Sequence, residues 1–153
     1  MNKRYYSYNE FREDLYTLID NIDEKFDTIL PIARGGLFIS LMLSEYYNIR
    51  KVYCINTIGY DDTKKLNSVE VSNIPNLTSS HRVLIVDDIV DSGDTLIKVL
   101  DILKREYPNI TFYSASMFYR DSAKIKPNWY VQKSNDWIEF FWEQDLIKEN
   151  NEI

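Results

Sequence analysis

Residues 83–95 read VLIVDDIVDSGDT, and this stretch decides the fold class. Apolar residues run directly into Asp87 and Asp88, a pattern that is typical of a buried strand ending in carboxylates. A serine, a glycine and a threonine follow, together with two further aspartates, Asp91 and Asp94. The leucines and the valine behind this turn recur at helical spacing. The stretch therefore predicts a strand, a polar turn and a helix, the repeating unit of α/β proteins.

The turn between this strand and helix combines groups that suit different ligands. Ser92, Gly93 and Thr95 offer hydroxyl and backbone N–H donors at a helix N-terminus, an arrangement that suits a phosphate. Asp87 and Asp88 would repel a phosphate, but ionised carboxylates accept hydrogen bonds from sugar hydroxyls and bind hydrated Mg²⁺. A ligand that carries phosphate, hydroxyls and a metal ion fits both halves. A solvated acidic turn that caps the helix is the alternative.

A second turn, ARGG at residues 33–36, follows the short apolar stretch TILPIA. Arg34 followed by two glycines lets a guanidinium and backbone N–H groups approach one anion closely, although a tight strand-to-helix turn would explain the same residues. Because parallel strands end at a common edge of the sheet, both turns are expected there. Together they indicate a ligand with phosphate at one end and pyrophosphate at the other, with a pentose between them.

The remaining sequence continues the alternation of helices and strands. The pattern S-x-x-E at Ser7–Glu10 predicts a capping box before an amphipathic helix that runs to Ile22, and residues 37–47 predict a second helix. Strands are expected at residues 28–33, 52–58, 82–88, 111–118 and 128–131, with an ordered segment at 137–142 and a fraying helix after it. This order predicts a largely parallel twisted sheet flanked by helices on both faces.

Composition and charge limit the class of protein. The length of 153 residues fits one domain, residues 1–153. A net charge of −6 disfavours a surface built for nucleic acid. A single cysteine excludes an internal disulfide and indicates a reducing compartment. No apolar run has the length of a signal-peptide core or a bilayer span, so a cytoplasmic protein without membrane contact is expected.

The motifs resemble those of a known family. Residues 83–95 match the phosphoribosyl-pyrophosphate signature of type I phosphoribosyltransferases at every defined position. ARGGLFISLMLSEYYNI, residues 33–49, is similar to the pyrophosphate loop and following helix of that family. WIEFFWE, residues 137–143, is similar to the carboxyl-terminal motif of its xanthine–guanine and hypoxanthine group. The resemblance covers residues 28–143 and implies the type I phosphoribosyltransferase fold, with a small hood.

The activity that the resemblance implies belongs to purine salvage. A 5-phosphoribosyl group would pass from phosphoribosyl pyrophosphate to a 6-oxopurine, giving a nucleoside monophosphate and pyrophosphate. The loop Asp91–Thr95 is expected to bind the 5′-phosphate, and Arg34 with Gly35 the pyrophosphate. Asp87 and Asp88 are expected to bind the ribose hydroxyls and Mg²⁺. The complete set of expected substrate-binding residues is Arg34, Gly35, Asp87, Asp88, Asp91, Ser92, Gly93, Asp94, Thr95, Arg120, Trp137 and Ile138.

The purine is expected to contact three parts of the chain. Asp91 occupies the position of an acid that lies near the base in the purine-using branch, and it is implied as the general base. Trp137 is implied to stack on the purine while the backbone of Ile138 reads its edge; a core or interface tryptophan is the alternative. The 6-oxopurine enzymes usually contact the purine O6 with a lysine. Arg120 is the nearest match here, and Lys124 is a second candidate.

The resemblance also implies a hood over the site. Residues 59–80 are polar and lack periodicity, and they match the hood's mobile loop in position. Residues 119–143 are implied to form its purine-binding segment. The serine–tyrosine pair that is usual in the hood reads Gly59–Tyr60 here. Asp94 adds an acid at a variable position of the phosphate loop and is expected to point away.

Two functions of different classes fit these residues. The first is a 6-oxopurine phosphoribosyltransferase that acts on phosphoribosyl pyrophosphate and guanine, xanthine or hypoxanthine as a homodimer or homotetramer. The second is a regulatory protein of the same fold, which would bind phosphoribosyl pyrophosphate or a nucleotide, and nucleic acid, without catalysis. The presence of Asp91, Arg34 and Trp137, together with the acidic net charge, favours the enzyme.

Overall fold

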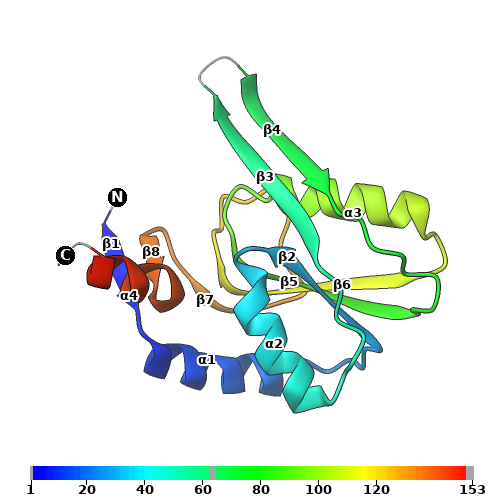
Figure 1. Cartoon of the computed structure of the whole chain (residues 1–153), viewed down its shortest axis with the longest axis horizontal. Coiled ribbons are helices and arrows are strands. Elements are labelled where there is room, and N and C mark those ends of the chain that lie inside the picture. The colour runs from blue at the N-terminus through cyan, green and yellow to red at the C-terminus, as the bar shows by residue number, and fades with distance from the viewer. Residues whose placement is uncertain (1, 63–64, 151–153) are drawn as a thin grey trace.

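The strand that opens the signature, β5, lies inside a six-stranded sheet between β2 and β6 (Figure 1). The computed structural model describes residues 2–62 and 65–150. Its helices and strands are β1 (Lys3–Tyr6), α1 (Tyr8–Asn21), β2 (Thr28–Ala33), α2 (Gly36–Tyr47), β3 (Ile55–Asp62), β4 (Lys65–Ser72), β5 (Arg82–Val90), α3 (Asp94–Glu106), β6 (Thr111–Tyr119), β7 (Trp129–Lys133), β8 (Trp137–Phe140) and α4 (Phe141–Asn150).

The six strands follow the order β4-β3-β2-β5-β6-β7. Neighbouring strands are parallel throughout except for β3 and β4, which are antiparallel. Parallel neighbours need crossover connections, and α2 and α3 supply them between β2 and β3 and between β5 and β6. The predicted largely parallel sheet flanked by helices is confirmed.

Strand β5 is buried on both faces, which explains its unbroken apolar run. Leu84 and Val86 belong to the core under α1 and α2, whereas Val83 and Ile85 belong to the core under α3. Successive side chains of a strand point to opposite faces, so one continuous run supplies both cores. The strand is thereby packed on both faces, and the polar residues at its carboxyl end lie at the edge of the sheet.

The helices of the described residues begin largely where the sequence predicts. Helix α1 has the expected capping box, since Ser7 Oγ accepts from the Glu10 N–H at 3.2 Å and the Glu10 carboxylate accepts from the Ser7 N–H at 2.9 Å. Helix α4 begins at Phe141, within the ordered segment 137–142 and before the position where a fraying helix was expected. None of the described helices combines the length and the apolarity that a membrane crossing requires.

The sequence pattern predicted no strand before the first helix, and this prediction was wrong. Strand β1 pairs in parallel with β8, with Lys3 opposite Trp137 and Tyr6 opposite Phe140, and the pair forms a sheet of its own. A strand of four residues has little local signal, because its hydrogen bonds come from a segment more than a hundred positions away. The N-terminal residues therefore lie beside the segment that was predicted to bind the base.

The prediction of a loop over residues 59–80 was also wrong for most of its length. Strands β3 and β4 form an antiparallel pair that projects beyond the rest of the sheet (Figure 1). Val69, Glu70 and Val71 alternate in polarity, as a strand requires, and Val71 packs against the core under α3. The pair includes Gly59 opposite Val69. Movement of this segment over the site stays a prediction.

Candidate active site

The two turns that were predicted to bind the ligand meet at the same edge of the sheet. Strands β2 and β5 are parallel neighbours, so their carboxyl ends lie side by side. The backbone of Gly35 comes so close to Asp88 that a Cβ atom would overlap the Asp88 carboxyl group. A Cβ atom on Gly36 would overlap the carbonyl oxygen of Val86. The two adjacent glycines therefore permit the close approach of the Arg34 turn to the acidic pair.

Asp87 and Asp88 lie at the end of β5 and are held by backbone donors. The Asp88 N–H donates to Asp87 Oδ1 at 3.0 Å, and the Ile89 N–H donates to Asp88 Oδ1 at 2.7 Å. Burial raises the pKa of Asp87 well above its ordinary value, and the neighbouring Asp88 carboxylate raises it further. Burial also raises the pKa of Asp88 to about 6, and the Glu143 charge contributes. A cation or several hydroxyl donors would stabilise the ionised pair, whose oxygen atoms suit hydrated Mg²⁺.

A small polar pocket of about 80 Å³ opens at the N-terminus of α3. Gly93 precedes the helix with φ of +85°, a conformation that favours glycine. Backbone N–H groups and the helix dipole attract an anion at this position. The pocket is lined by Asp87, Ile89, Val90, Asp91, Ser92, Gly93, Thr95 and Leu96. The size of the pocket and its donors suit a single phosphate group.

Asp94 belongs to this loop but is not among the residues that line the pocket. Its Oδ1 lies 2.6 Å from Lys124 Nζ, and its Oδ2 accepts from Ser92 Oγ at 3.0 Å. These hydrogen bonds, first that from Lys124 and then that from Ser92, lower the pKa of Asp94. Lys124, one of the two candidates for the base donor, therefore contacts the phosphate loop through Asp94.

Arg120, the other candidate, contacts the predicted general base. Its Nε lies 3.0 Å from Asp91 Oδ1, and its Nη2 donates to the carbonyl oxygen of Asp136 at 3.2 Å. The Arg120 side chain is 12% exposed, whereas that of Asp91 is 56% exposed. Since Asp136 directly precedes Trp137, the guanidinium connects the predicted proton acceptor with the residue before the predicted stacking residue.

A cavity of about 550 Å³ lies between the Arg34 turn and the C-terminal segment. Its lining residues are Arg34, Gly35, Trp137, Trp142, Glu143, Gln144 and Leu146. The Ala33–Arg34 peptide bond at its edge is cis. Trp137 is 56% exposed, whereas the neighbouring Ile138 is buried. An exposed indole in the wall of a cavity can stack on a flat ligand, and Trp137 is not a core tryptophan.

Glu143 also belongs to this site, although it was not among the residues predicted from the sequence. It lies in the first turn of α4, lines the cavity, and is close enough to Asp88 for its charge to raise the pKa of that carboxyl group. Glu143 is the last residue of the WIEFFWE motif, and only Trp137 and Ile138 of that motif were predicted as site residues. The neighbouring Trp142 packs against other aromatic rings. Its ring stacks on Phe140 at 4.6 Å between centroids and on Phe38 at 5.6 Å. This packing holds Glu143 at the cavity.

Comparison with known proteins connects this geometry with a family. The model of the phosphoribosyl transferase domain matches residues 3–146. A xanthine-guanine phosphoribosyltransferase of Idiomarina loihiensis is 27% identical over 126 residues, which cover 80% of this chain and 74% of that protein. The chain is therefore similar to the relative over most of both sequences, and the match includes both ligand turns.

Two solved structures that resemble this chain are also phosphoribosyltransferases. The xanthine-guanine-hypoxanthine phosphoribosyltransferase of Helicobacter pylori is 36% identical, with a TM-score of 0.90 over 98% of this chain and 99% of that one. A purine phosphoribosyltransferase of Pyrococcus horikoshii is 27% identical, with a TM-score of 0.80 over 94% and 95%. The family inferred from the sequence motifs is confirmed. Because the family model spans most of the sequence and the fold agrees throughout, this chain belongs to the phosphoribosyl transferase domain family.

Proposed function

We propose that this chain is a purine phosphoribosyltransferase, a pentosyltransferase that makes nucleoside monophosphates from phosphoribosyl pyrophosphate and a 6-oxopurine. The products are the nucleotide and pyrophosphate, and the substrates are guanine, xanthine or hypoxanthine. One observation carries the proposal: Arg34, Gly35 and Trp137 line a single cavity, and Gly35 lies against Asp88. A pyrophosphate-binding turn, a sugar-binding pair and a stacking face are thereby adjacent, as transfer to a base requires.

Phosphoribosyl pyrophosphate would lie across the two turns. Its 5′-phosphate fits the pocket at the N-terminus of α3, and its ribose hydroxyls would donate to Asp87 and Asp88. Its pyrophosphate would extend toward Arg34 and the backbone of Gly35. The paired carboxylates, whose pKa values are raised by burial, fit Mg²⁺, which Asp87 and Asp88 would hold. Bound Mg²⁺ would offset the negative charge of the pyrophosphate.

The transfer breaks one bond and forms another at C1′. A purine nitrogen bonds to C1′, the bond from C1′ to the pyrophosphate oxygen breaks, and the electron pair leaves with pyrophosphate. Asp91 accepts the proton that the purine loses. Arg34 stabilises the charge that develops on the leaving group. The ion pair with Arg120, at 3.0 Å, would hold the Asp91 carboxylate in place for this step.

Recognition of the base would use three groups, of which Trp137 is among the residues that line the cavity and Ile138 and Arg120 are not. Trp137 stacks on the purine, and base–aromatic stacking of this kind contributes about 1–3 kcal/mol. The backbone of Ile138 reads an edge of the ring. Arg120, which has five N–H donors, is placed between Asp91 and the Trp137 segment and would donate to the O6 atom.

A measurement of pyrophosphate release tests this proposal directly. The chain is supplied with Mg²⁺ and phosphoribosyl pyrophosphate, together with guanine, xanthine, hypoxanthine, adenine or orotate. We expect release with the three 6-oxopurines and little with adenine or orotate. If the chain binds phosphoribosyl pyrophosphate but releases no pyrophosphate with any base, the enzymatic proposal fails and a regulatory protein of this fold remains.

We propose one phosphoribosyltransferase domain over residues 1–153, in which residues 119–143 form the purine-binding segment and the β3–β4 pair closes over the substrates. A cytoplasmic homodimer or homotetramer without nucleic acid or membrane partners fits this activity. Size-exclusion chromatography with light scattering would measure the oligomeric state.

A further inference from the structure

The strand that carries the base-binding residues is separate from the main sheet. Strand β8, with Trp137 and Ile138, pairs with β1 in a two-stranded sheet that places Lys3 opposite Trp137. The Trp137 N–H also donates to the carbonyl oxygen of Asn2 at 2.8 Å. The position of β8 over the site therefore depends on how β1 is attached to the rest of the protein.

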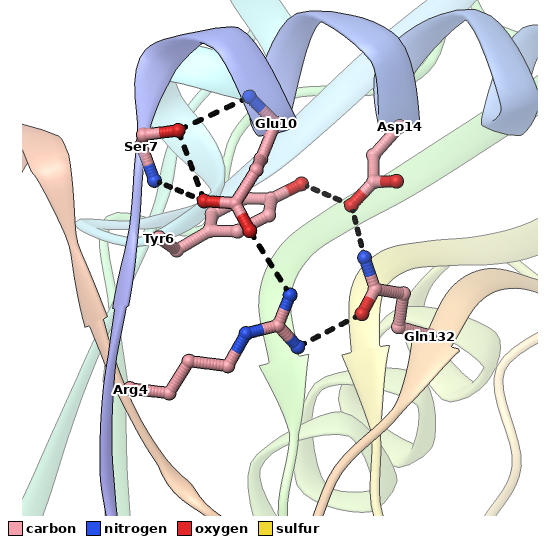
Figure 2. A network of polar contacts seen from close by, with 6 residues as sticks. All are labelled: Arg4, Tyr6, Ser7, Glu10, Asp14 and Gln132. Atoms are coloured by element: carbon pink, nitrogen blue, oxygen red, sulfur yellow. Dashed lines mark hydrogen bonds and ion pairs between the residues drawn. The ribbon is translucent and has the colours of Figure 1, made fainter.

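A hydrogen-bond network attaches β1 (Figure 2). The hydroxyl of the fully buried Tyr6 donates to Asp14 Oδ2 at 2.6 Å, and the same oxygen accepts from Gln132 Nε2 at 2.6 Å. Gln132 Oε1 accepts from Arg4 Nη1 at 2.9 Å, and Arg4 Nη2 pairs with Glu10 at 3.2 Å. We call Arg4, Tyr6, Asp14 and Gln132 the N-terminal anchor. It joins β1 to α1 and to β7.

The chemistry of the N-terminal anchor fixes its geometry. An arginine only donates and an ionised carboxylate only accepts, so the Gln132 amide has one orientation that satisfies both Arg4 and Asp14. Burial, and then the hydrogen bond to Asp14, raises the pKa of Tyr6 far above its ordinary value, so its hydroxyl stays a donor at neutral pH. A closed set of matched donors and acceptors constrains position more strongly than an isolated surface ion pair does.

The N-terminal anchor also reaches the strand that leads to Arg120. Gln132 of β7 lies opposite Phe118 of β6, two residues before Arg120. The Arg4 guanidinium lies 5.7 Å from the centroid of the Phe118 ring. One side of the N-terminal anchor therefore holds the strand of Trp137, and the other side contacts the strand of Arg120. The residues of the anchor are absent from the linings of both site cavities.

We propose that the N-terminal anchor positions the purine. It fixes the separation between Trp137 and Arg120, so that a stacked base presents its C6 edge to the guanidinium and its proton to Asp91. This inference rests on the proposed function and assigns it residues that never touch the substrate. The site for phosphoribosyl pyrophosphate is built on β2, β5 and α3, which do not contribute to the anchor. Loss of the anchor should therefore weaken purine recognition selectively.

The test compares five variants of the full chain by steady-state kinetics with each substrate varied in turn. Gln132→Leu and Asp14→Leu remove hydrogen bonds of the N-terminal anchor, and each should raise the KM for guanine about tenfold. The KM for phosphoribosyl pyrophosphate should stay within about twofold of wild type. Asp14→Asn keeps a carbonyl oxygen that can accept from both Tyr6 and Gln132, so this variant should retain most of the wild-type guanine affinity.

Glu24→Gln is the matched control. It breaks the ion pair with Arg82, which joins the segment before β2 to the first residue of β5 and touches neither site cavity. This variant should leave both KM values unchanged, even if its thermal midpoint falls as far as those of the leucine variants. An equal loss of guanine affinity in Glu24→Gln would mean that general destabilisation explains the effect and would overturn the inference.

A second measurement keeps the proposal testable where a leucine variant folds poorly. Arg4→Met removes only the arginine from the N-terminal anchor and should raise the guanine KM about threefold. Hydrogen exchange at the backbone amides of residues 137–140 should become faster in Gln132→Leu and Arg4→Met but not in Glu24→Gln. If wild type makes no nucleotide from any purine, the proposed function fails, and the inference with it. If wild type is active and the anchor variants keep its guanine KM, only the inference fails.

Discussion

Arg120 Nε lies 3.0 Å from Asp91 Oδ1, so the residue that was predicted to read the base is paired with the residue that was predicted to take its proton. The arginine is largely buried and also donates to the carbonyl oxygen of Asp136. A guanidinium held on two sides has little freedom to turn, and it fixes the carboxylate that it binds. Recognition of the base and removal of its proton are therefore expected to depend on each other.

Substitution of Asp91 tests its role as the general base. Asp91→Asn keeps a hydrogen-bond acceptor for Arg120 but can no longer take a proton at neutral pH. We expect kcat to fall by about 10²–10⁴-fold, the range for a positioned general base. The affinity for phosphoribosyl pyrophosphate, measured by calorimetry, should change little, because the phosphate pocket keeps its hydroxyl and backbone N–H donors.

Asp121→Asn is the control for that change. Asp121 forms an ion pair with Lys133 on the surface, at 2.8 Å, and is even more exposed than Asp91. Its substitution removes one negative charge close to Arg120 in sequence, at a residue that lines neither site cavity. Normal turnover by Asp91→Asn, or an equal loss in both variants, would remove Asp91 from the role of general base.

Substitution of Arg34 tests the pyrophosphate end of the site. Arg34→Ala should raise the KM for phosphoribosyl pyrophosphate by at least tenfold, because a charge-assisted hydrogen bond contributes about 1.5–3 kcal/mol. Arg34→Lys keeps the charge but loses the fork of donors, and it should recover only part of the affinity. Equal weakening of purine and phosphoribosyl pyrophosphate binding in Arg34→Ala would indicate that the whole turn is disturbed.

The parts of the site that the sequence predicted well are local ones. Strand, turn and helix around residues 83–95 are adjacent in the chain, so the acidic pair, the phosphate loop and the capping glycine can be recognised together. Gly35 and Gly36 were interpreted as a turn that approaches an anion. The structure adds that they approach Asp88 and the carbonyl of Val86, a contact between the turn after β2 and strand β5 that no local pattern contains.

The parts that the sequence did not predict depend on contacts between distant segments. Strand β1 exists because it pairs with β8, and Glu143 belongs to the site because aromatic packing holds α4 at the cavity. The pairing of Lys124 with Asp94 joins residues 30 positions apart. Residues 59–80 were predicted as a loop because they are mostly polar and lack periodicity. The strands that form there are stabilised by pairing with each other, which local composition does not show.

The acidic pair should make stability depend on pH. The pKa of Asp88 is about 6 in the folded chain against an ordinary value of 3.8, because burial penalises the charged form. The folded state therefore holds this proton more tightly than the unfolded state does. The stabilisation is complete below pH 3.8 and is lost as the pH rises to about 6, and it is on the order of 3 kcal/mol. Asp87, whose pKa is also raised, acts in the same direction.

Urea unfolding between pH 4 and pH 7 measures this effect. Glu10, Asp27 and Asp94 have lowered pKa values and act in the opposite direction, so the useful quantity is the difference between Asp88→Asn and wild type. The free energy of unfolding of Asp88→Asn relative to wild type should increase from pH 4 to pH 6 and level off above. A difference that stays constant across this range would show that Asp88 titrates normally.

Substitution of Arg120 tests which bases the site accepts. Stacking on Trp137 suits any purine, so discrimination must come from a donor at the C6 edge. A donor there satisfies the oxygen of guanine, xanthine and hypoxanthine but leaves the amino group of adenine facing another donor, at a cost of about 1–3 kcal/mol. Wild type should therefore use adenine poorly, and Arg120→Met should narrow the gap in kcat/KM between guanine and adenine.

Arg120→Lys separates two proposed roles of Arg120, donation to the base and orientation of Asp91. Lysine keeps a donor for the O6 atom, so this variant should still favour guanine over adenine. It loses the fork that holds Asp91 and the Asp136 carbonyl together, so its kcat should fall with every base. Arg120→Met should lose both properties, because it has neither a charge nor a donor. Wild-type turnover of adenine at the rate of guanine would refute the assignment of Arg120 to the base edge. A normal kcat in Arg120→Lys would show that the guanidinium does not orient Asp91.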